Sequence, residues 1–246
     1  MGADTQSDRR RRGPRGYAQF GEDRKLRRIF GDRRGVCVEV GGHDGVTGSN
    51  TYLFEQLGWE CLVVEPVPYL ARAIREARSC RVVEAAADAR DGEAEFLIAV
   101  GGDMLSTLDN ESRRLSRIDE HDGRLERIVV RTRTLDHILE EAGVARVDFV
   151  TIDVEGNELR VLEGLSLERW QPRIVIVEDN SFCSDDAVQA YLARHGYTRF
   201  RITGVNHWYC RADDAQLATR ARRASARVFA AAVRLYGAAR RRLHRR

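Results

Sequence analysis

The sequence predicts an α/β domain built on a mostly parallel sheet. Short apolar segments of strand length alternate along the chain with segments whose apolar residues recur at helical spacing. Four of the strand segments end in an acidic residue: Glu39, Glu65, Asp153 and Glu178. A glycine-rich turn that starts at Gly41 follows the first of them. This pattern is typical of sheets that bind a ligand beyond the carboxyl ends of their strands.

The first half of the chain supplies three expected strands of this sheet, each joined to the next by a helix. We expect a helix at 17–30, a strand at 36–40, a helix at 51–57, a strand at 61–65, a helix at 70–77 and a strand at 82–86. Gly58 is suited to end the second helix, and Pro66 stops the second strand. Further strands are expected at 93–100 and 127–134, on either side of a polar, mobile segment at 101–123.

The second half continues the alternation and closes with a hairpin. We expect a helix at 135–142, a strand at 147–153, a helix at 159–165, a strand at 174–179 and a helix at 185–195. Gly196 stops the last of these helices. Segments 197–203 and 207–211 then form an antiparallel pair around the turn at 204–206. The connections are short enough for a single domain over about 17–211.

The two termini differ in composition from this domain. Residues 1–16 are rich in arginine and predict a disordered basic tail, either solvated or in contact with nucleic acid, of which we favour the first. Residues 212–246 combine arginine with alanine and valine at three-four spacing, which predicts an amphipathic helix. It could pack on the domain, pair in a homo-oligomer or lie on an anionic membrane surface, and composition favours the first two.

Composition also limits the classes of protein to which the chain could belong. The 246 residues carry a net charge of only +3, and 43% are hydrophobic, enough for one substantial core. The five cysteines form no C-x-x-C pair, which suits reduced thiols better than a disulfide framework or a zinc site. No apolar stretch approaches the ~18 residues of a membrane span, and no apolar signal segment begins the chain. We therefore expect a cytoplasmic protein without a transmembrane segment.

The strand-end acids indicate a ligand site. Charged groups at the ends of buried strands are costly unless they pair or bind something, and helix capping explains only about one of the four. Glu65 follows Glu39 by one strand-helix-strand unit. An acid at that place commonly holds a ribose diol, although an ordinary strand-end acid is the alternative.

Several motifs in order resemble one family. Gln19-Phe20-Gly21-Glu22-Asp23 is followed by the glycine turn, Ser49-Asn50-Thr51, Leu57-Gly58-Trp59, Val64-Glu65-Pro66, Ile152-Asp153-Val154-Glu155-Gly156-Asn157-Glu158 and Val161-Leu162-Glu163-Gly164. This set resembles the FkbM-type family of S-adenosylmethionine (SAM)-dependent methyltransferases over about 17–210. The Ile-Asp-Val-Glu-Gly-x-Glu block is its most specific part.

The resemblance implies a class I methyltransferase fold: a Rossmann-like, seven-stranded, mostly parallel sheet with its last strand antiparallel and helices on both faces. It also implies SAM as methyl donor and a hydroxyl acceptor on a sugar or natural-product scaffold, as in bacterial secondary metabolism. It implies that the SAM pocket is formed by Glu39, Gly41, Asp44, Gly45 and Asn50 on the methionine and ribose side, Glu65 at the ribose, Asp88 near the adenine, and Asp153 beside the methionine amino group or the acceptor.

An alcohol acceptor needs its proton removed or its oxygen polarised. One solution is a side-chain base, for which the candidates are Asp153, Glu155, His43 and His207. The other is Mg²⁺ held by Asp153, Asp179 and Asn180 on adjacent strand ends, similar to the metal triad of catechol-type O-methyltransferases. Alternatively, Glu178 faces inward and Asp179 caps the next helix.

Two other functions remain as alternatives. A nucleic-acid methyltransferase could use the arginine-rich termini for phosphate contacts. Against it, Asp153-Val154-Glu155-Gly156 stands where such enzymes carry an Asn-Pro-Pro-Tyr tetrapeptide. The other alternative is a non-catalytic SAM-binding protein. A small-molecule or glycan acceptor is expected to contact loops 101–123 and 180–186, whose composition names no molecule.

Overall fold

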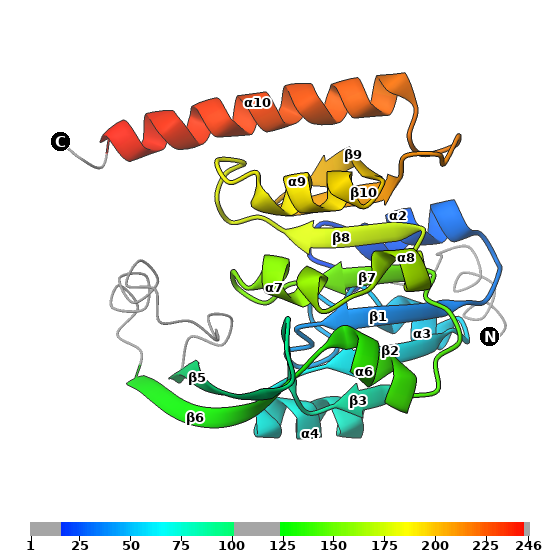
Figure 1. Cartoon of the computed structure of the whole chain (residues 1–246), viewed down its shortest axis with the longest axis vertical. Coiled ribbons are helices and arrows are strands. Elements are labelled where there is room, and N and C mark those ends of the chain that lie inside the picture. The colour runs from blue at the N-terminus through cyan, green and yellow to red at the C-terminus, as the bar shows by residue number, and fades with distance from the viewer. Residues whose placement is uncertain (1–15, 101–123, 244–246) are drawn as a thin grey trace, which may run out of the picture.

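The structure, a computed structural model, describes residues 16–100 and 124–243 (Figure 1). Its main sheet has seven strands in the order β3-β2-β1-β7-β8-β10-β9. Their bounds are β1 Val36–Val40, β2 Glu60–Val64, β3 Arg81–Val83, β7 Phe149–Ile152, β8 Ile174–Glu178, β9 Tyr197–Thr203 and β10 Asn206–Arg211. Strand β10 is antiparallel to both neighbours, whereas the pairs from β3 to β8 are parallel. The predicted seven-stranded, mostly parallel sheet of a class I methyltransferase is thereby confirmed.

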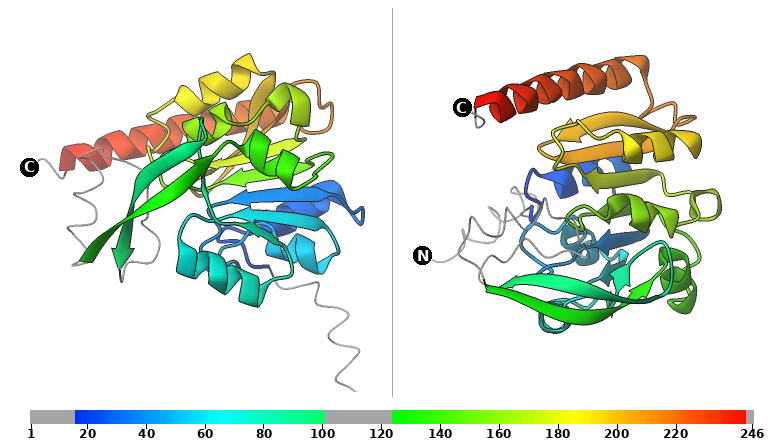
Figure 2. Two further views of the ribbon diagram at one scale, coloured as in Figure 1. Left: turned by 60° about the horizontal axis from the view of Figure 1, so that its bottom comes forward. Right: turned by 60° about the vertical axis from the view of Figure 1, so that its left-hand side comes forward.

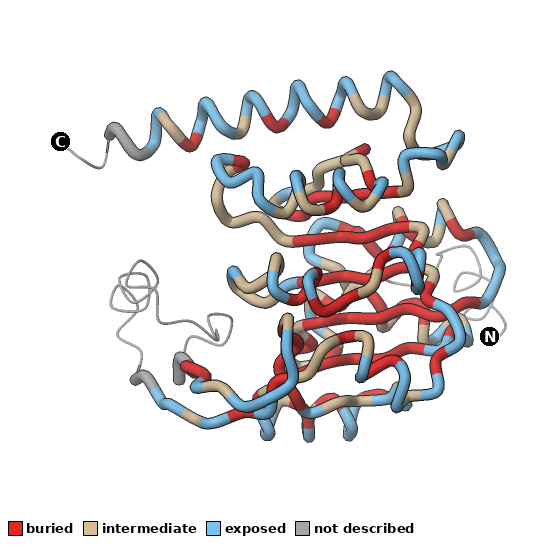
Figure 3. Tube along the Cα trace, in the orientation of Figure 1, coloured by how far each residue is buried: buried red, intermediate tan, exposed pale blue. Residues whose placement is uncertain are grey.

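Helices cover both faces of this sheet (Figures 1 and 2). Their bounds are α2 Glu22–Phe30, α3 Tyr52–Gln56, α4 Pro68–Ala77, α6 Leu135–Glu141, α7 Glu158–Glu163, α8 Leu167–Trp170, α9 Ala187–Arg194 and α10 Arg220–Leu243. Buried side chains of α2 and α3 share one core with one face of the sheet, and those of α6 to α9 share a second core with the other face. The central strands β2, β1, β7, β8 and β10 are buried almost throughout (Figure 3).

The side chains of β1 alternate between the two faces of the sheet, so this strand contributes to both cores. Val38 lies in the core beneath α6 and α7, whereas Cys37 lies in the core beneath α2 and α3. Because successive side chains of a strand point to opposite faces, Glu39 is directed to the same side as Cys37. An acid within a fully buried strand must therefore find its partners on that side.

A smaller second sheet stands at the carboxyl edge of the first. Strands β4 Ala86–Ala87, β5 Gly92–Val100 and β6 Arg124–Arg133 form it in the order β4-β6-β5. The segment expected as one strand at 82–86 is thus divided between two sheets, because β3 ends at Val83. The short helix α8 was not predicted. The expected tail at 1–16, apart from Gly16, and the expected mobile segment at 101–123 lie outside the described residues.

The C-terminal segment forms the long helix α10, which begins at Arg220 rather than near 212. It lies beside β9 at the edge of the sheet, and its carboxyl end extends beyond the carboxyl ends of the parallel strands (Figure 1). No described helix is long and apolar enough to cross a membrane. The five cysteines are free thiols.

Candidate active site

A cavity opens at the carboxyl ends of β1, β2 and β7. Its lining comes from those strand ends, from α4 and from the small sheet: Val40, Gly41, His43, Val64, Glu65, Pro66, Leu70, Ala85, Ala86, Ala87, Phe96, Asp153, Val154 and Glu155. Of the residues predicted to bind cofactor, it includes Gly41, Glu65 and Asp153. The wall formed by the alanines and Phe96 is apolar, as a flat aromatic base requires.

Gly41 lets two strand ends approach each other. Its φ is 86°, and a Cβ there would lie 1.8 Å from the carbonyl oxygen of Asp153. Any other residue would meet that backbone atom, which cannot move without displacing β7. The glycine therefore brings the turn after β1 against the carboxyl end of β7 and joins two walls of the cavity.

Glu65 closes β2 and organises the same turn. Its Oε2 accepts hydrogen bonds from the backbone N–H groups of Gly42 at 3.1 Å and His43 at 3.0 Å, and its Oε1 accepts one from Val67 at 3.0 Å. Burial raises the pKa of Glu65, while the three N–H groups oppose that shift. Oε2 already accepts two of these bonds, whereas Oε1 retains a lone pair, so this group can still accept from a hydroxyl in the cavity.

His43 lies on the cavity wall in a left-handed backbone conformation, with φ of 48°. Its ring Nε2 is buried, and no described residue offers it a hydrogen bond. Buried polar atoms are seldom left without a partner in folded proteins. This nitrogen is therefore a buried, unsatisfied polar atom in a residue of the cavity wall.

Glu39 has a different setting from the one predicted, because it is not among the residues that line the cavity. Ser49 Oγ and the Asn50 N–H donate to its carboxylate at 2.7 Å each, Thr51 Oγ1 donates at 2.5 Å, and Arg78 Nη1 donates at 3.1 Å. Those donors surround it on the α3 side of β1. The contacts tie the turn after β1 to α3 and to the end of α4.

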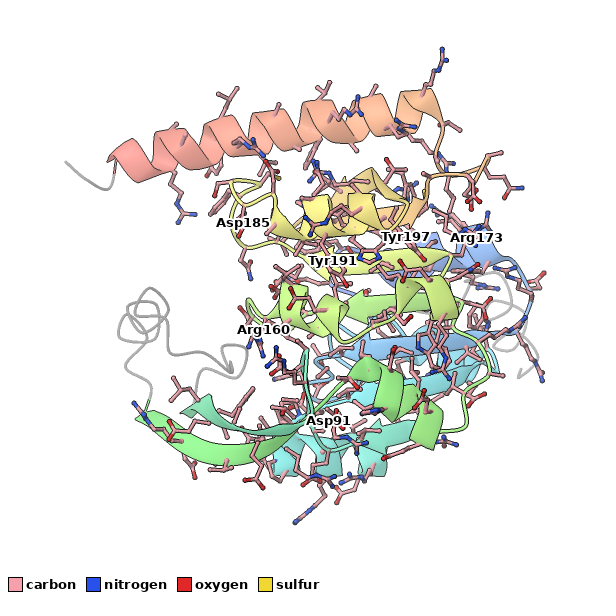
Figure 4. All side chains as sticks on the ribbon, viewed as in Figure 1. Asp91, Arg160, Arg173, Asp185, Tyr191 and Tyr197 are labelled. Atoms are coloured by element: carbon pink, nitrogen blue, oxygen red, sulfur yellow. The ribbon has the colours of Figure 1, made fainter. Side chains whose placement is uncertain are left out.

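Three other predicted cofactor residues also use their polar groups within the protein. Asp88 forms a two-point pair with Arg160, at 2.6 and 2.9 Å, and it does not line the cavity (Arg160 is labelled in Figure 4). Asp44 Oδ1 accepts from the N–H groups of Val46 and Thr47. Asn50 donates its backbone N–H to Glu39, and its side-chain oxygen is buried without a described partner.

A cluster of carboxylates stands beside the cavity. Asp153, Glu155 and Glu178 each direct an oxygen to within 4.8 Å of the others. Asn180 donates its side-chain amide to Glu178 at 2.7 Å and to Glu155 at 3.4 Å. The strand ends of β7 and β8 thus bring together three acids that the sequence separates by up to a full strand-helix-strand unit.

Mutual repulsion and burial alter the protonation of this cluster. Burial raises the pKa of Glu178 to about 10, and the charges of Asp153 and Glu155 act in the same direction. Burial and the charge of Glu39 also raise the pKa of Asp153, which Glu178 opposes by hydrogen bonding. Glu178 therefore keeps a proton at neutral pH, and the two carboxyls titrate as a coupled pair.

Glu178→Gln should flatten the dependence of stability on pH. In the unfolded chain Glu178 titrates near its ordinary value of 4.5, but in the fold it keeps its proton up to about pH 10. Between these values the native state binds the additional proton, so the free energy of unfolding falls as pH rises, by at most ~1.4 kcal/mol per pH unit. Urea unfolding from pH 6 to 9 measures this slope. Glu126→Gln, at an exposed carboxylate of β6, is the control and should leave the slope unchanged.

Asp179 does not join this cluster, which corrects the predicted metal triad of Asp153, Asp179 and Asn180. Its Oδ1 accepts from the Ser181 N–H at 2.7 Å, and its Oδ2 accepts from the Cys183 N–H at 3.1 Å and lies 3.5 Å from His207 Nε2. Glu178 is the residue of this dipeptide that faces Asp153, as the alternative prediction held. Asp179 stabilises the turn after β8.

His207, a candidate base, forms a second cluster with Asp179 and Cys183 and is absent from the cavity lining. Its Nε2 lies 3.4 Å from Cys183 Sγ, and Arg199 Nη1 lies 3.2 Å from its Nδ1. Because a guanidinium can only donate, Nδ1 accepts and Nε2 carries the hydrogen. A ring in this tautomer has no free Nε2 lone pair for a metal or for a substrate proton.

The sequence-based prediction missed the apolar wall of the cavity and the buried cation beneath it. Ala85, Ala86 and Phe96 carry no motif, and they reach the site only because β3, β4 and β5 meet there. Arg78 follows α4 with no spacing signal, yet its side chain is fully buried between Glu39 and Glu55. For Glu178 the sequence did carry a signal, namely its position at the end of a predicted strand.

Comparisons with known proteins give the following matches. Residues 39–199 match the methyltransferase FkbM domain family. A search of curated proteins finds no match. Similar solved structures include a precorrin-6y C5,15-methyltransferase from Geobacter metallireducens (12% identity, 78% of this chain and 86% of that chain, TM-score 0.44) and a putative caffeoyl-CoA O-methyltransferase from Staphylococcus aureus (12%, 83% and 88%, 0.45). An O-methyltransferase from Bacillus cereus in complex with SAH is 15% identical, over 78% of this chain and 79% of that chain, with a TM-score of 0.41.

Proposed function

The chain belongs to the FkbM methyltransferase family, which is SAM-dependent, and from this premise we propose that it methylates a hydroxyl group of a sugar or natural-product scaffold. The observation that carries the proposal is the carboxylate cluster of Asp153, Glu155 and Glu178 beside the cavity. A hydroxyl is a poor nucleophile until its proton is removed or its oxygen is polarised, so a proton-accepting group suits this acceptor.

Bound SAM supplies a methyl group on a sulfonium, which is already activated for in-line displacement. In the proposed arrangement Glu65 Oε1 accepts a hydrogen bond from a hydroxyl of the ribose diol, and the alanines and Phe96 enclose the adenine. His43 Nε2 contacts a polar group of the methionine end, since it has no described partner in the protein. Glu39 and Asp88 act indirectly, by holding the turns that shape the cavity.

Asp153 is the proposed base. It lines the cavity, and its hydrogen bond with Glu178 lowers its pKa and so favours the ionised form that a base requires. Protonated Glu178 keeps that charge in place by a hydrogen bond, and Asn180 in turn donates to Glu178. The acceptor would enter from the side of the turn at 180–186, which continues directly from these residues.

Titration calorimetry with SAM tests the cofactor assignment. We expect saturable binding of one SAM per chain in the micromolar range, which is ordinary for an enzyme cavity with a few directed polar contacts. Absence of heat at millimolar SAM would reject both the proposed function and the assignment of the cavity.

Methyl transfer from radiolabelled SAM to a panel of acceptors tests the reaction itself. The panel should contain free sugars, glycosides and hydroxylated macrolide or polyphenol scaffolds, with matched amines and thiols. We expect label in the hydroxyl compounds. Label confined to the amines or thiols would contradict the proposed acceptor class without affecting the assignment of SAM.

The carboxylate cluster also has the oxygen ligands that Mg²⁺ prefers, and we propose that the ion replaces the shared proton there. Asp153, Glu155 and Glu178 would hold it, and the Asn180 amide would have to turn its oxygen inward. The ion would supply polarisation of the acceptor oxygen. EDTA should then lower turnover, and added Mg²⁺ should restore it. Turnover that EDTA leaves unchanged would identify the proton-sharing pair as sufficient.

A further inference from the structure

Helix α10 has two apolar faces, one of small residues that packs on the domain and one of larger, mostly exposed side chains. Ala226 and Ala230 are buried where the helix packs beside β9, and Gly237 continues the same face. These small residues allow close approach of the helix to the domain. Farther along, Arg234 donates to the Cys183 carbonyl oxygen and pairs with Asp186, which fixes the helix against the turn after β8.

The opposite face of α10 exposes large apolar side chains to solvent. The exposed fractions are 71% for Val228, 47% for Phe229, 72% for Leu235 and 62% for Tyr236. Val228 and Leu235 are seven positions apart, as are Phe229 and Tyr236, so the four form one stripe along two turns. Packing on the domain therefore accounts for the alanine face, whereas the outer stripe stays mostly exposed and meets the domain where the centroid of the Tyr236 ring lies 6.4 Å from that of Phe182.

The charge of α10 indicates which kind of partner could cover the exposed stripe. The helix contains eight arginines and no acidic residue: Arg220, Arg222, Arg223, Arg227, Arg234, Arg240, Arg241 and Arg242. Among the described ion pairs, only the one between Arg234 and Asp186 involves this helix. If two copies met through the stripe, arginine would face arginine with no carboxylate from either helix between them. An anionic surface, by contrast, complements both the charge and the apolar stripe.

We propose that α10 binds the surface of an anionic membrane, lying in its plane with Val228, Phe229, Leu235 and Tyr236 inserted at the headgroup boundary. The arginines on either side of the stripe would contact the lipid phosphates, as in other basic amphipathic helices. Such a helix lies on the bilayer and does not cross it, in keeping with the absence of a described membrane-spanning helix. The domain would remain on the aqueous side, held through the alanine face.

Vesicle flotation with the full chain tests this proposal. We expect binding to vesicles of equal parts phosphatidylglycerol and phosphatidylcholine, little binding to phosphatidylcholine alone, and weaker binding as salt screens the arginines. The double variant Val228→Glu/Leu235→Glu should bind the anionic vesicles at least about tenfold more weakly, because both side chains would otherwise bury apolar surface. Its circular dichroism and SAM affinity should match the parent chain, since neither residue contacts the domain core or the cavity.

Val129→Glu is the matched control. Val129 is a valine exposed to 67% on β6, so it tests the loss of an apolar group and the gain of a negative charge away from α10. The control should retain vesicle binding. Equal binding of the parent chain and the α10 double variant would overturn the proposal. So would a parent chain that ignores anionic vesicles but sediments as a dimer that the double variant dissociates, because the stripe would then be a self-association surface.

Discussion

Asp153→Asn should lower turnover by about 10²- to 10⁴-fold while changing the affinity for SAM only a few-fold. The substitution preserves the shape of the side chain but removes the proton acceptor that faces the cavity. The neighbouring carboxyl of Glu178, with its pKa raised to about 10, already holds a proton and cannot replace it at neutral pH. The same loss is expected if the cluster holds Mg²⁺, since one of its charged ligands disappears.

Turnover is measured with the best acceptor from the labelled panel, and SAM affinity by calorimetry. Asp179→Asn is the informative control, because Asp179 follows the neighbouring strand β8 but faces the turn at 181–183. It should reduce turnover less than about threefold. If instead Asp179→Asn were as inactive as Asp153→Asn, the triad suggested by the sequence would be the working one. A large loss of SAM affinity in Asp153→Asn would assign that side chain to the cofactor.

The fold was predictable because its signals are local and repeated. The parallel strands β1, β2, β7 and β8 are short, mostly apolar runs, and the short connections leave few topologies for a parallel sheet. Departures occur where pairing with a distant partner decides the outcome. Ala86 leaves the main sheet because it pairs with Thr132 of β6, and no local pattern at 82–86 carries that information.

The sequence predicted the location of the site better than it predicted the role of each residue in it. Strand ends indicated Glu65 and Asp153, and both line the cavity. Whether an acid faces ligand or protein depends on the strand's alternation and on what lies opposite. Glu39 points to the same face of the sheet as Cys37 and there contacts Arg78, which is 39 positions away in the sequence. At the end of β8 the same alternation of side chains places Glu178, and not Asp179, beside Asp153.

The C-terminal helix shows a further limit of periodicity. The spacing of apolar residues at 212–246 predicted an amphipathic helix, and α10 forms. Periodicity could not reveal that its small residues and its large apolar residues occupy opposite faces. That division depends on which face meets the domain, and it is what separates packing on the domain from binding to another surface.

Glu65→Gln should weaken SAM binding about 100-fold. The carboxylate oxygens accept from the N–H groups of Gly42, His43 and Val67, and Oε1 is also the proposed acceptor for the ribose diol. An amide presents one N–H₂ group in place of an acceptor, so at least one charge-assisted contact is lost and one N–H group faces a donor. Calorimetry measures the change, and Glu60→Gln, at the exposed amino end of β2, should leave the affinity unaltered.

Competition by adenosine and by 2′,3′-dideoxyadenosine separates ribose recognition from support of the turn. In the parent chain adenosine should displace SAM far better than the dideoxy compound, because only adenosine offers a diol hydroxyl to Glu65. In Glu65→Gln the two competitors should become nearly equal. A variant that binds both more weakly but keeps the original preference would show that Glu65 only holds Gly42 and His43 in place, and that another group recognises the ribose.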